Sequence, residues 1–419
     1  MRDELRKTIN FLFKDKRGKN YLIYGLILII SSISFYAINY FFIIKNTESS
    51  NFFNAYASAR FVFLEGLNPY REINTRLVAL AAENNIEFIP KEPAFGLPFF
   101  TLFLYFPFSI SSNYLAAQAL WMTCNQMLLL YLLYIVIKLL DWKIKITIFW
   151  CLALIAIFFY SNWFNVMNQN LSIIQAAILL TSMYYEKRDM SILSGVFLGL
   201  CFINPFYFIA PTILYIYILI KKQNSAAVLW MMITLVLLFL SSIIINSSWF
   251  LDYLRVMVLE PSIFPFKPSA ENFALTIGAT SNALWNIIPL AAMIWMIAEW
   301  LRTPLSQFKH QFWLVSLSFI LGQFITVQPD PINSVLFFPV FIFLVYLWEI
   351  RIKNLSKIYI YILGILFSFG VLAINYFITR DLFLISNFQV INIITGILLV
   401  LNLYWVRVWA ISTYSLDAS

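Results

Sequence analysis

The sequence predicts an all-α protein that crosses a membrane many times, and the observations behind this prediction are its composition and its apolar runs. Of 419 residues, 62% are hydrophobic and 11% are charged, whereas about a quarter of a soluble domain is charged. Continuous apolar runs of roughly 20 residues, enough for a helix to span a bilayer, recur from end to end. Their continuity argues against the alternating strands of a β-barrel. We expect one integral membrane domain over residues 1–419.

The first 19 residues are rich in basic side chains. These are Arg2, Arg6, Lys7, Lys14, Lys16, Arg17 and Lys19. Basic clusters beside a span stay in the cytoplasm, so we expect a cytoplasmic N-terminus and a first span at residues 20–44 that leads outward. That apolar run is too long for a cleaved signal peptide and lacks the small-residue cleavage site.

The longest polar interval, residues 45–92, follows the first span. Apolar residues recur in it at helical spacing in two groups: Phe52, Phe53, Tyr56 and Phe63, then Ile73, Leu77, Leu80 and Ala81. Gly66 and Asn68-Pro69 mark a turn between the groups. We therefore expect two amphipathic helices lying on the membrane surface. If the protein performs chemistry, we expect the polar groups of this interval to start it.

The remainder of the chain is mostly apolar. A short run at residues 95–110, interrupted by Pro98 and Pro107, favours a re-entrant or interfacial segment. The other runs, counted together with 20–44, predict about twelve spans. These runs are 113–139, 146–161, 171–185, 190–204, 206–220, 225–246, 284–301, 311–327, 332–349, 357–378 and 388–409.

Alternation from a cytoplasmic N-terminus separates the basic loops from the polar ones. The basic residues assigned inside are Lys138, Lys143, Lys145, Lys187, Arg188, Lys221, Lys222, Arg302, Lys309, Arg351, Lys353, Lys357 and Arg407. The polar stretches assigned outside are 45–92, 162–170, 247–283 and 328–331. This distribution follows the positive-inside rule. It predicts a multi-pass protein of the cell membrane, with both termini cytoplasmic and its polar groups gathered at the outer rim of the bundle.

Other classes of protein receive little support. The net charge of +8 comes from short basic clusters that orientation and lipid headgroups explain, so we expect no nucleic-acid partner. Cys124, Cys151 and Cys201 fall within apolar runs, as small buried hydrophobes do. No phosphate-binding loop, zinc spacing or dinucleotide fingerprint is present, so we expect no cofactor and no dedicated metal site. Gly195 and Gly199 have the spacing of close helix packing.

Four stretches, in order, resemble the motifs of one family. They are residues 51–70 (NFFNAYASARFVFLEGLNPY), Lys91-Glu92-Pro93 with the apolar run after it, Asn168-Gln169-Asn170, and Trp249, Tyr253 and Leu254 with Asn272-Phe273-Ala274-Leu275. The chain thereby resembles the GT-C class of membrane glycosyltransferases, in particular glycosyltransferase family 87, the polyprenyl-phosphate-mannose-dependent mannosyltransferase-like proteins. The resemblance implies a GT-C fold and transfer of a sugar on the extracytoplasmic side. The implied partners are a polyprenyl-phosphate sugar donor, a glycolipid or glycan acceptor, and membrane lipids.

The chain departs from the family pattern at three places. Asn51 stands where the family has its acid, and Glu48, three residues earlier, is the substitute we favour. Asn204 stands where a lysine is often found near the end of the fifth span. The only histidine, His310, falls in a loop assigned inside, and Asp330 occupies the late outer loop where family members often carry histidines.

The implied reaction needs a base for the acceptor hydroxyl and cations for the leaving lipid phosphate. The candidate catalytic bases are Glu48, Glu92 and Asp330, whose alternative role is that of solvated loop acids. The candidate phosphate partners are Arg60, Lys91 and Lys267, whose alternative role is contact with lipid headgroups.

Amides suit sugar hydroxyls, and aromatic rings suit the apolar faces of sugars. The candidate sugar contacts are Asn51, Asn168, Gln169, Asn170 and Asn272, whose alternative role is helix capping. Tyr70 and Trp249 are candidate stacking surfaces, whose alternative role is anchoring in the aromatic belt.

Three other functions stay open. A lipid-linked glycan flippase or other transporter would carry polar groups at midspan and an internal repeat, and the sequence shows neither. A glycan polymerase or ligase would usually carry several arginines in an outer loop, where residues 247–283 contain only Arg255. A non-catalytic family member is suggested by Asn51 and Asn204.

Overall fold

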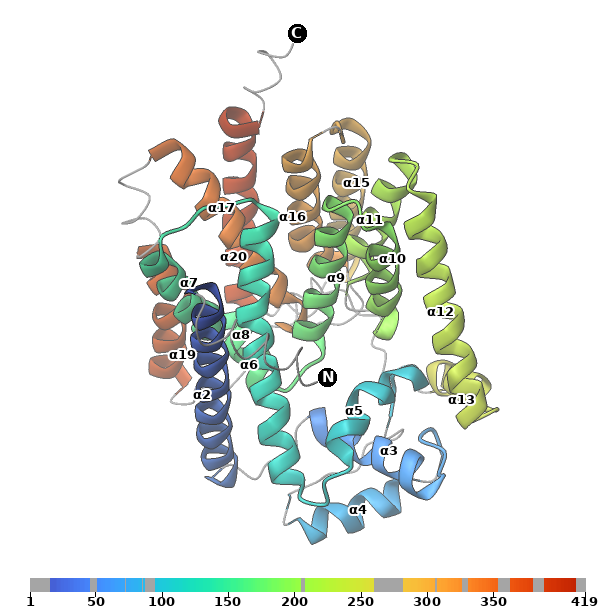
Figure 1. The fold of residues 1–419 in the computed structure, drawn as a ribbon. Helices are drawn as coiled ribbons and strands as arrows, with labels where there is room; N and C mark the ends of the chain where they lie inside the picture. The colour runs from blue at the N-terminus through green and yellow to red at the C-terminus, as the bar shows by residue number, and fades with distance from the viewer. Residues whose placement is uncertain are drawn as a thin grey trace, which may run out of the picture.

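The computed structural model describes residues 16–45, 51–71, 73–84, 86, 95–204, 208–259, 282–305, 307–325, 331–352, 362–379 and 388–411. Within these ranges every regular element is a helix, and the chain is an all-α polytopic membrane protein, as predicted. Figure 1 shows a bundle of long helices with a smaller group of helices at one end.

The bundle contains the membrane-spanning part of the chain. Its helices are α2 (Lys16–Lys45), α6 (Tyr114–Leu139), α7 (Ile146–Phe158), α8 (Tyr160–Met167), α9 (Ser172–Lys187), α10 (Ser191–Leu200), α11 (Ile209–Lys221), α12 (Ser225–Ile245), α15 (Asn282–Arg302), α16 (Phe308–Ile325), α17 (Phe337–Ile352), α19 (Val371–Thr379) and α20 (Phe388–Val406). Short helical turns are η2 (Cys201–Ile203) and η3 (Pro331–Leu336), and the π-helical turns are η4 (Leu366–Gly370) and η6 (Arg407–Ile411).

Every run predicted to span coincides with helix in the described residues. Five helices are long and apolar enough to cross a membrane: Gly25–Ile44, Tyr114–Leu139, Ser225–Ile245, Ser334–Arg351 and Ile391–Trp409. The pair α7 and α8, bent by 50°, makes a sixth if it counts as one span. Shorter apolar helices include 191–203, 209–221 and 362–374. The count of about twelve crossings therefore stays a prediction.

One end of the bundle is held by ion pairs between helix ends, and we call it the basic end. Lys187 pairs with Asp141, and Lys222 pairs with Glu186 with an Nζ to Oε1 distance of 2.7 Å. Residues 141, 187 and 222 stand at the ends of α6, α9 and α11, three helices whose basic ends were predicted to share one face. At the same end Glu299 accepts from Arg407, with an Oε2 to Nη1 distance of 2.6 Å.

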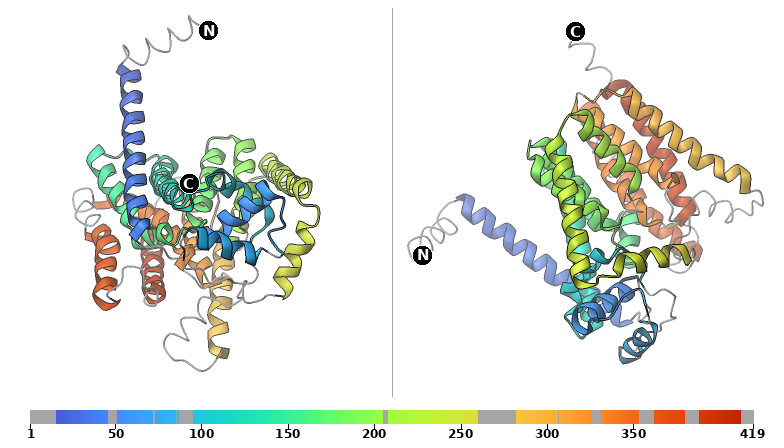
Figure 2. Two further views of the ribbon diagram at one scale, coloured as in Figure 1. Left: turned by 90° about the horizontal axis from the view of Figure 1, so that it is seen from below. Right: turned by 90° about the vertical axis from the view of Figure 1, so that its right-hand side faces the viewer.

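The opposite end carries the cap, which we define as α3 (Asn51–Glu65), α4 (Asn74–Glu83), η1 (Phe99–Thr101) with α5 (Leu102–Ser109), and α13 (Trp249–Leu259). Figure 2 shows these helices lying across the end of the bundle. The amphipathic helices of residues 45–92 are present as predicted. Their apolar stripes, however, pack inside a protein cluster with α5 and α6 rather than facing lipid, and Phe52, Phe53 and Leu77 are fully buried.

Two glycines fix α12, the helix that leads into the cap. A Cβ on Gly195 would lie 2.2 Å from the carbonyl oxygen of Ala227, and one on Gly199 would lie 2.7 Å from the Cβ of Thr234. Such contacts leave no room for a side chain, so the close packing predicted from this spacing is confirmed. Through this contact α10 sets the position of α12 and of α13 beyond it.

Candidate functional site

A buried carboxylate in the cap joins two segments that are far apart in the sequence. Asp252 lies on α13 with its side chain 6% exposed. Its Oδ1 accepts from the Nε of Arg71 at 3.0 Å and the Nη2 of Arg71 at 2.6 Å. Its Oδ2 accepts from the Nδ2 of Asn68 and the Oγ of Ser248, both at 2.7 Å. Each carboxylate oxygen therefore accepts two hydrogen bonds, and we call these four residues the Asp252 cluster.

The turn that supplies Asn68 and Arg71 follows from local sequence. Gly66 ends α3 with a φ of +70°, which favours glycine. The side-chain oxygen of Asn68 then accepts from the main-chain N–H of Tyr70 at 3.0 Å, and the Arg71 N–H donates to the Asn68 carbonyl. This asparagine turn directs the side chains of residues 68 and 71 to the same carboxylate.

The other half of the cluster is set by the junction of α12 and α13. Asn246 follows the last residue of α12, and its Oδ1 accepts from the main-chain N–H of Ser248 at 3.2 Å. The chain turns there, and α13 begins at Trp249. Asp252 falls in the first turn of α13, where a negative charge interacts favourably with the helix dipole.

The cluster favours the ionised carboxylate. Burial of Asp252 opposes ionisation, but the hydrogen bonds from Arg71, Ser248 and Asn68 together outweigh it, so its pKa lies below the ordinary value of 3.8. A carboxylate with a lowered pKa and four donors is a poor general base, because accepting a proton would cost it those bonds. Asp252 is thus a structural anion at neutral pH.

Aromatic rings fill the cap behind this cluster. Trp249 is 2% exposed, and its ring lies against Phe99, Phe239 and Tyr253 with centroid distances of 5.3–6.3 Å. The Tyr70 hydroxyl donates to the carbonyl of Leu97 at 2.7 Å, and burial raises the pKa of Tyr70 well above its usual range. Both rings pack within the protein, so their predicted stacking against a sugar stays a prediction.

The predicted amide contacts lie in a buried turn next to the cap. The Nδ2 of Asn168 donates to the carbonyl of Phe164 at 2.9 Å, so this residue caps the end of α8. Gln169 has a φ of +58°, and its main-chain carbonyl accepts from the indole N–H of Trp121. Trp121 lies on α6 and packs in the same hydrophobic cluster as the helices of the cap. The Nδ2 of Asn170 donates to the Oδ1 of Asn165. The turn therefore serves helix capping, and sugar binding by its amides stays a prediction.

Arg60 contacts the end of α5. Its Nη1 donates to the carbonyls of Ser109 and Ser111 at 3.1 and 3.3 Å, and the Tyr56 hydroxyl donates to the Ser111 carbonyl at 2.6 Å. A cation is favourable at this position because the carbonyls at a helix C-terminus carry partial negative charge. Binding of a phosphate by Arg60 stays a prediction.

The remaining predicted site residues lie outside the described part of the chain. These are Glu48, Glu92 and Asp330, with Lys91, Lys267 and Asn272; Asn51 begins α3, but its side chain is likewise outside it. Within the described ranges, no group of three or more His, Cys, Asp or Glu side chains could hold a metal ion.

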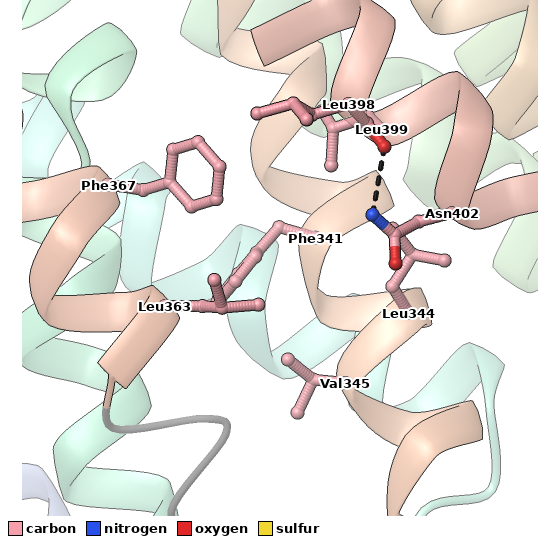
Figure 3. Close-up of a pocket in the computed structure, with 8 residues that line it drawn as sticks. All are labelled: Phe341, Leu344, Val345, Leu363, Phe367, Leu398, Leu399 and Asn402. Carbon is pink, nitrogen blue, oxygen red and sulfur yellow. Dashed lines mark hydrogen bonds between the residues drawn. The ribbon is translucent and has the colours of Figure 1, made fainter.

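A cavity of about 120 Å³ lies within the bundle, away from the cap. Figure 3 shows its lining side chains from α17, from the helix at 362–374, and from α20. Its polar lining side chain is Asn402, whose Nδ2 donates to the carbonyl of Leu398 at 2.9 Å. The lining suits hydrocarbon, and the predicted site residues are not part of it.

The described helices define a polytopic helical membrane protein with a group of helices lying across one end of its bundle, which is consistent with the GT-C class. The family model of glycosyltransferase family 87 matches residues 95–329, more than half of the chain. The chain belongs to this family and is a glycosyltransferase by family membership. No curated protein and no solved structure matches it.

Sequence reasoning missed the Asp252 cluster. The signal was present: residues 247–283 carry an acid between the two aromatic residues of the family element, Trp249 and Tyr253, and Arg71 follows the predicted turn directly. An acid inside an otherwise apolar helical stretch needs a partner. Only the folded chain shows that its partner comes from 181 residues earlier.

Proposed function

We propose that this chain transfers a sugar, a mannose-like hexose or a pentose, from a polyprenyl-phosphate donor to a lipid-linked or cell-surface glycan on the extracytoplasmic side of the cell membrane. Family membership supplies the class of reaction. The observation that carries the proposal further is that the cap and the ion-paired basic residues lie at opposite ends of the bundle (Figure 1). The positive-inside rule favours a cytoplasmic basic end with both termini on that side, and hence an external cap.

The proposed step is a single displacement. The acceptor hydroxyl oxygen attacks the anomeric carbon, and the bond from that carbon to the phosphate oxygen breaks with inversion. The electron pair stays on the polyprenyl phosphate, and the hydroxyl proton passes to a carboxylate base. Cationic side chains stabilise the leaving phosphate.

The residues proposed for these roles are those singled out by the sequence. Glu48, Glu92 and Asp330 are the candidate bases, since the described Asp252 carboxylate has all its bonding capacity filled by Arg71, Asn68 and Ser248. Arg60, Lys91 and Lys267 are the candidate phosphate partners. The candidate sugar contacts are Asn51, Asn168, Gln169, Asn170 and Asn272. Tyr70 is a further candidate, through stacking of its ring.

The test is transfer of a labelled sugar from polyprenyl-phosphate donors into membrane lipid, with and without this protein. We expect transfer that depends on the protein and falls by about a hundredfold or more in one of Glu48→Gln, Glu92→Gln and Asp330→Asn. Glu83→Gln, which alters an exposed acid of α4, is the matched control and should keep full activity.

The outcomes separate the alternatives. Full activity of all three amide variants would remove the assignment of the base while leaving the reaction in place. No transfer from any polyprenyl-phosphate sugar would reject the proposed reaction and favour a flippase or a non-catalytic family member.

A further inference from the structure

Arg71 is the member of the Asp252 cluster that faces solvent. Its side chain is 58% exposed, although it shares two hydrogen bonds with a carboxylate that is 6% exposed. Those bonds use Nε and Nη2. None of the hydrogen bonds that Arg71 makes to described residues uses its Nη1, and more than half of the side chain is exposed.

The carboxylate fixes the direction of this edge. A guanidinium is planar, so two bonds to Oδ1 set the orientation of the whole group. Oδ2 is held in turn by Asn68 and Ser248, which leaves Asp252 no freedom to rotate. A buried anion held in this way can orient a cation for an interaction on the cation's other side, as acids behind metal-binding histidines do.

Arg71 is the cationic member of the cluster and also its exposed member. Asp252 balances its charge, so recognition of an anion would depend on the guanidinium donors rather than on net charge. Each of the two segments of the cluster has a further arginine close by, Arg76 and Arg255, and both are exposed. Arg76 lies 3.8 Å from Glu65, with side chains 62% and 34% exposed, a loose surface pair that orients nothing. Of these three arginines, Arg71 is the one that a buried carboxylate holds in a fixed direction, and a fixed planar donor edge matches the oxygens of a phosphate.

We propose that Asp252 is a positioning residue that aims Arg71 at the phosphate of the donor lipid. This inference rests on the proposed function and adds Arg71 to the candidate phosphate partners. It also gives the cluster a reason to join residues 68–71 with residues 248–252, which belong to two of the polar stretches assigned to the outer side, 45–92 and 247–283.

The experiment measures binding of decaprenyl phosphate, without a sugar, to the full-length protein in nanodiscs, with decaprenyl alcohol as the neutral partner ligand. The measured quantity is the dissociation constant of the alcohol divided by that of the phosphate. This ratio reports the contribution of the phosphate group alone. A purely structural defect lowers affinity for both ligands and leaves the ratio unchanged. Nanodiscs of phosphatidylglycerol and competition by inorganic phosphate distinguish the donor phosphate from a general headgroup or a free anion.

The variants are Arg71→Gln, Arg71→Lys and Asp252→Asn, with Arg76→Gln as the matched control. We expect Arg71→Gln to lower the ratio by about tenfold to a hundredfold, the loss of a charged hydrogen bond. Asp252→Asn should lower it by about threefold to tenfold because Arg71 stays but is less well oriented. Arg71→Lys keeps the charge without the fork and should fall between them. Arg76→Gln should change it by less than about twofold.

The possible outcomes distinguish failure of this inference from failure of the proposed function. A wild-type ratio well above one that Arg71→Gln leaves unchanged overturns this inference and spares the proposed function. A wild-type ratio near one means that the protein does not recognise the phosphate, and both proposals fall. Full competition by phosphatidylglycerol would assign Arg71 to headgroups and overturn the assignment to the donor. If Asp252→Asn does not fold, Arg71→Gln and Arg71→Lys still decide.

Discussion

The two ends of the bundle differ in what their charged pairs join. At the basic end, each pair joins the ends of helices, and the exposure of the acid varies: Asp141 is 69% exposed, whereas Glu299 and Glu186 are 12% and 9% exposed. In the cap, Asp252 is buried and bonded by three residues from two distant segments, and only its arginine is exposed. The comparison indicates that charge at the basic end ties helix ends together, whereas charge in the cap joins two segments that are 181 residues apart in the sequence.

We expect the largest effect from a substitution that loosens the contact between α10 and α12, the helix that leads into the cap. Gly195→Ala would push a methyl group to 2.2 Å from a main-chain oxygen of α12. Because the atom in the way belongs to the main chain, the two helices must move apart, and we expect a loss of about 1–3 kcal/mol of stability and a displaced α13. Thermal unfolding in detergent measures the first effect, and loss of donor binding measures the second. Gly25→Ala is the control, since nothing lies within 4 Å of that position. Equal stability of the two variants would show that the α10–α12 contact does not carry the cap.

The next test compares one acid from each end. Asp252→Asn should cost about 1–2 kcal/mol of stability, a value discounted because Arg71 is largely exposed. Asp141→Asn removes a pair that is mostly in water and should cost less than about 0.5 kcal/mol. Thermal unfolding of both variants checks this order. A larger cost at Asp141 would reverse our view of the two ends.

Acid should act on the cap through the same residue. The pKa of Asp252 is lower in the folded state than its ordinary value of 3.8, so its contribution to stability is present above that value and is lost as pH falls through the lower, folded-state pKa. The difference in melting temperature between the wild type and Asp252→Asn should therefore be constant from neutral pH to about 5 and shrink below 4. A difference that grows on acidification would mean that the folded-state pKa is raised.

The smallest expected effect is within the cap itself. The pair of Arg76 and Glu65 is long and exposed, so a double-mutant cycle of Arg76→Ala and Glu65→Ala should give a coupling energy below about 0.5 kcal/mol. The same cycle on Arg71 and Asp252 should give a clearly larger value. Equal coupling energies for the two pairs would show that Asp252 holds Arg71 no more firmly than Glu65 holds Arg76.

Much of the fold was predictable because hydrophobic periodicity encodes it locally. Each predicted span is helical in the part that the structure describes, and Gly195 and Gly199 meet α12 as their spacing indicated. The sequence misjudged what covers Phe52 and Leu77, because an amphipathic stripe looks the same whether lipid or protein buries it. It also missed the contact of Arg71 with Asp252, because nothing local reveals which of several loop charges will meet across 181 residues.

The predicted site depended on family resemblance, and only part of it is open to comparison with the structure. The matched region, 95–329, contains Asn168, Gln169, Asn170 and Trp249, but it begins after Arg60 and Tyr70. The amides cap a turn and the rings fill the cap, which are the ordinary roles of such residues. Geometry of this kind shows what holds the side chains, and activity measurements must show what they recognise.

The contact between Arg71 and Asp252 also constrains whether the number of membrane crossings between them is even or odd. Two polar side chains can meet outside the bilayer only if both lie on the same side, so the chain between residues 71 and 252 must cross an even number of times. The same parity holds between Asp141 and Lys187, between Glu186 and Lys222, and between Glu299 and Arg407. The runs predicted to span satisfy all four conditions, with six, two, two and four in these intervals. The four contacts played no part in the assignment of those runs.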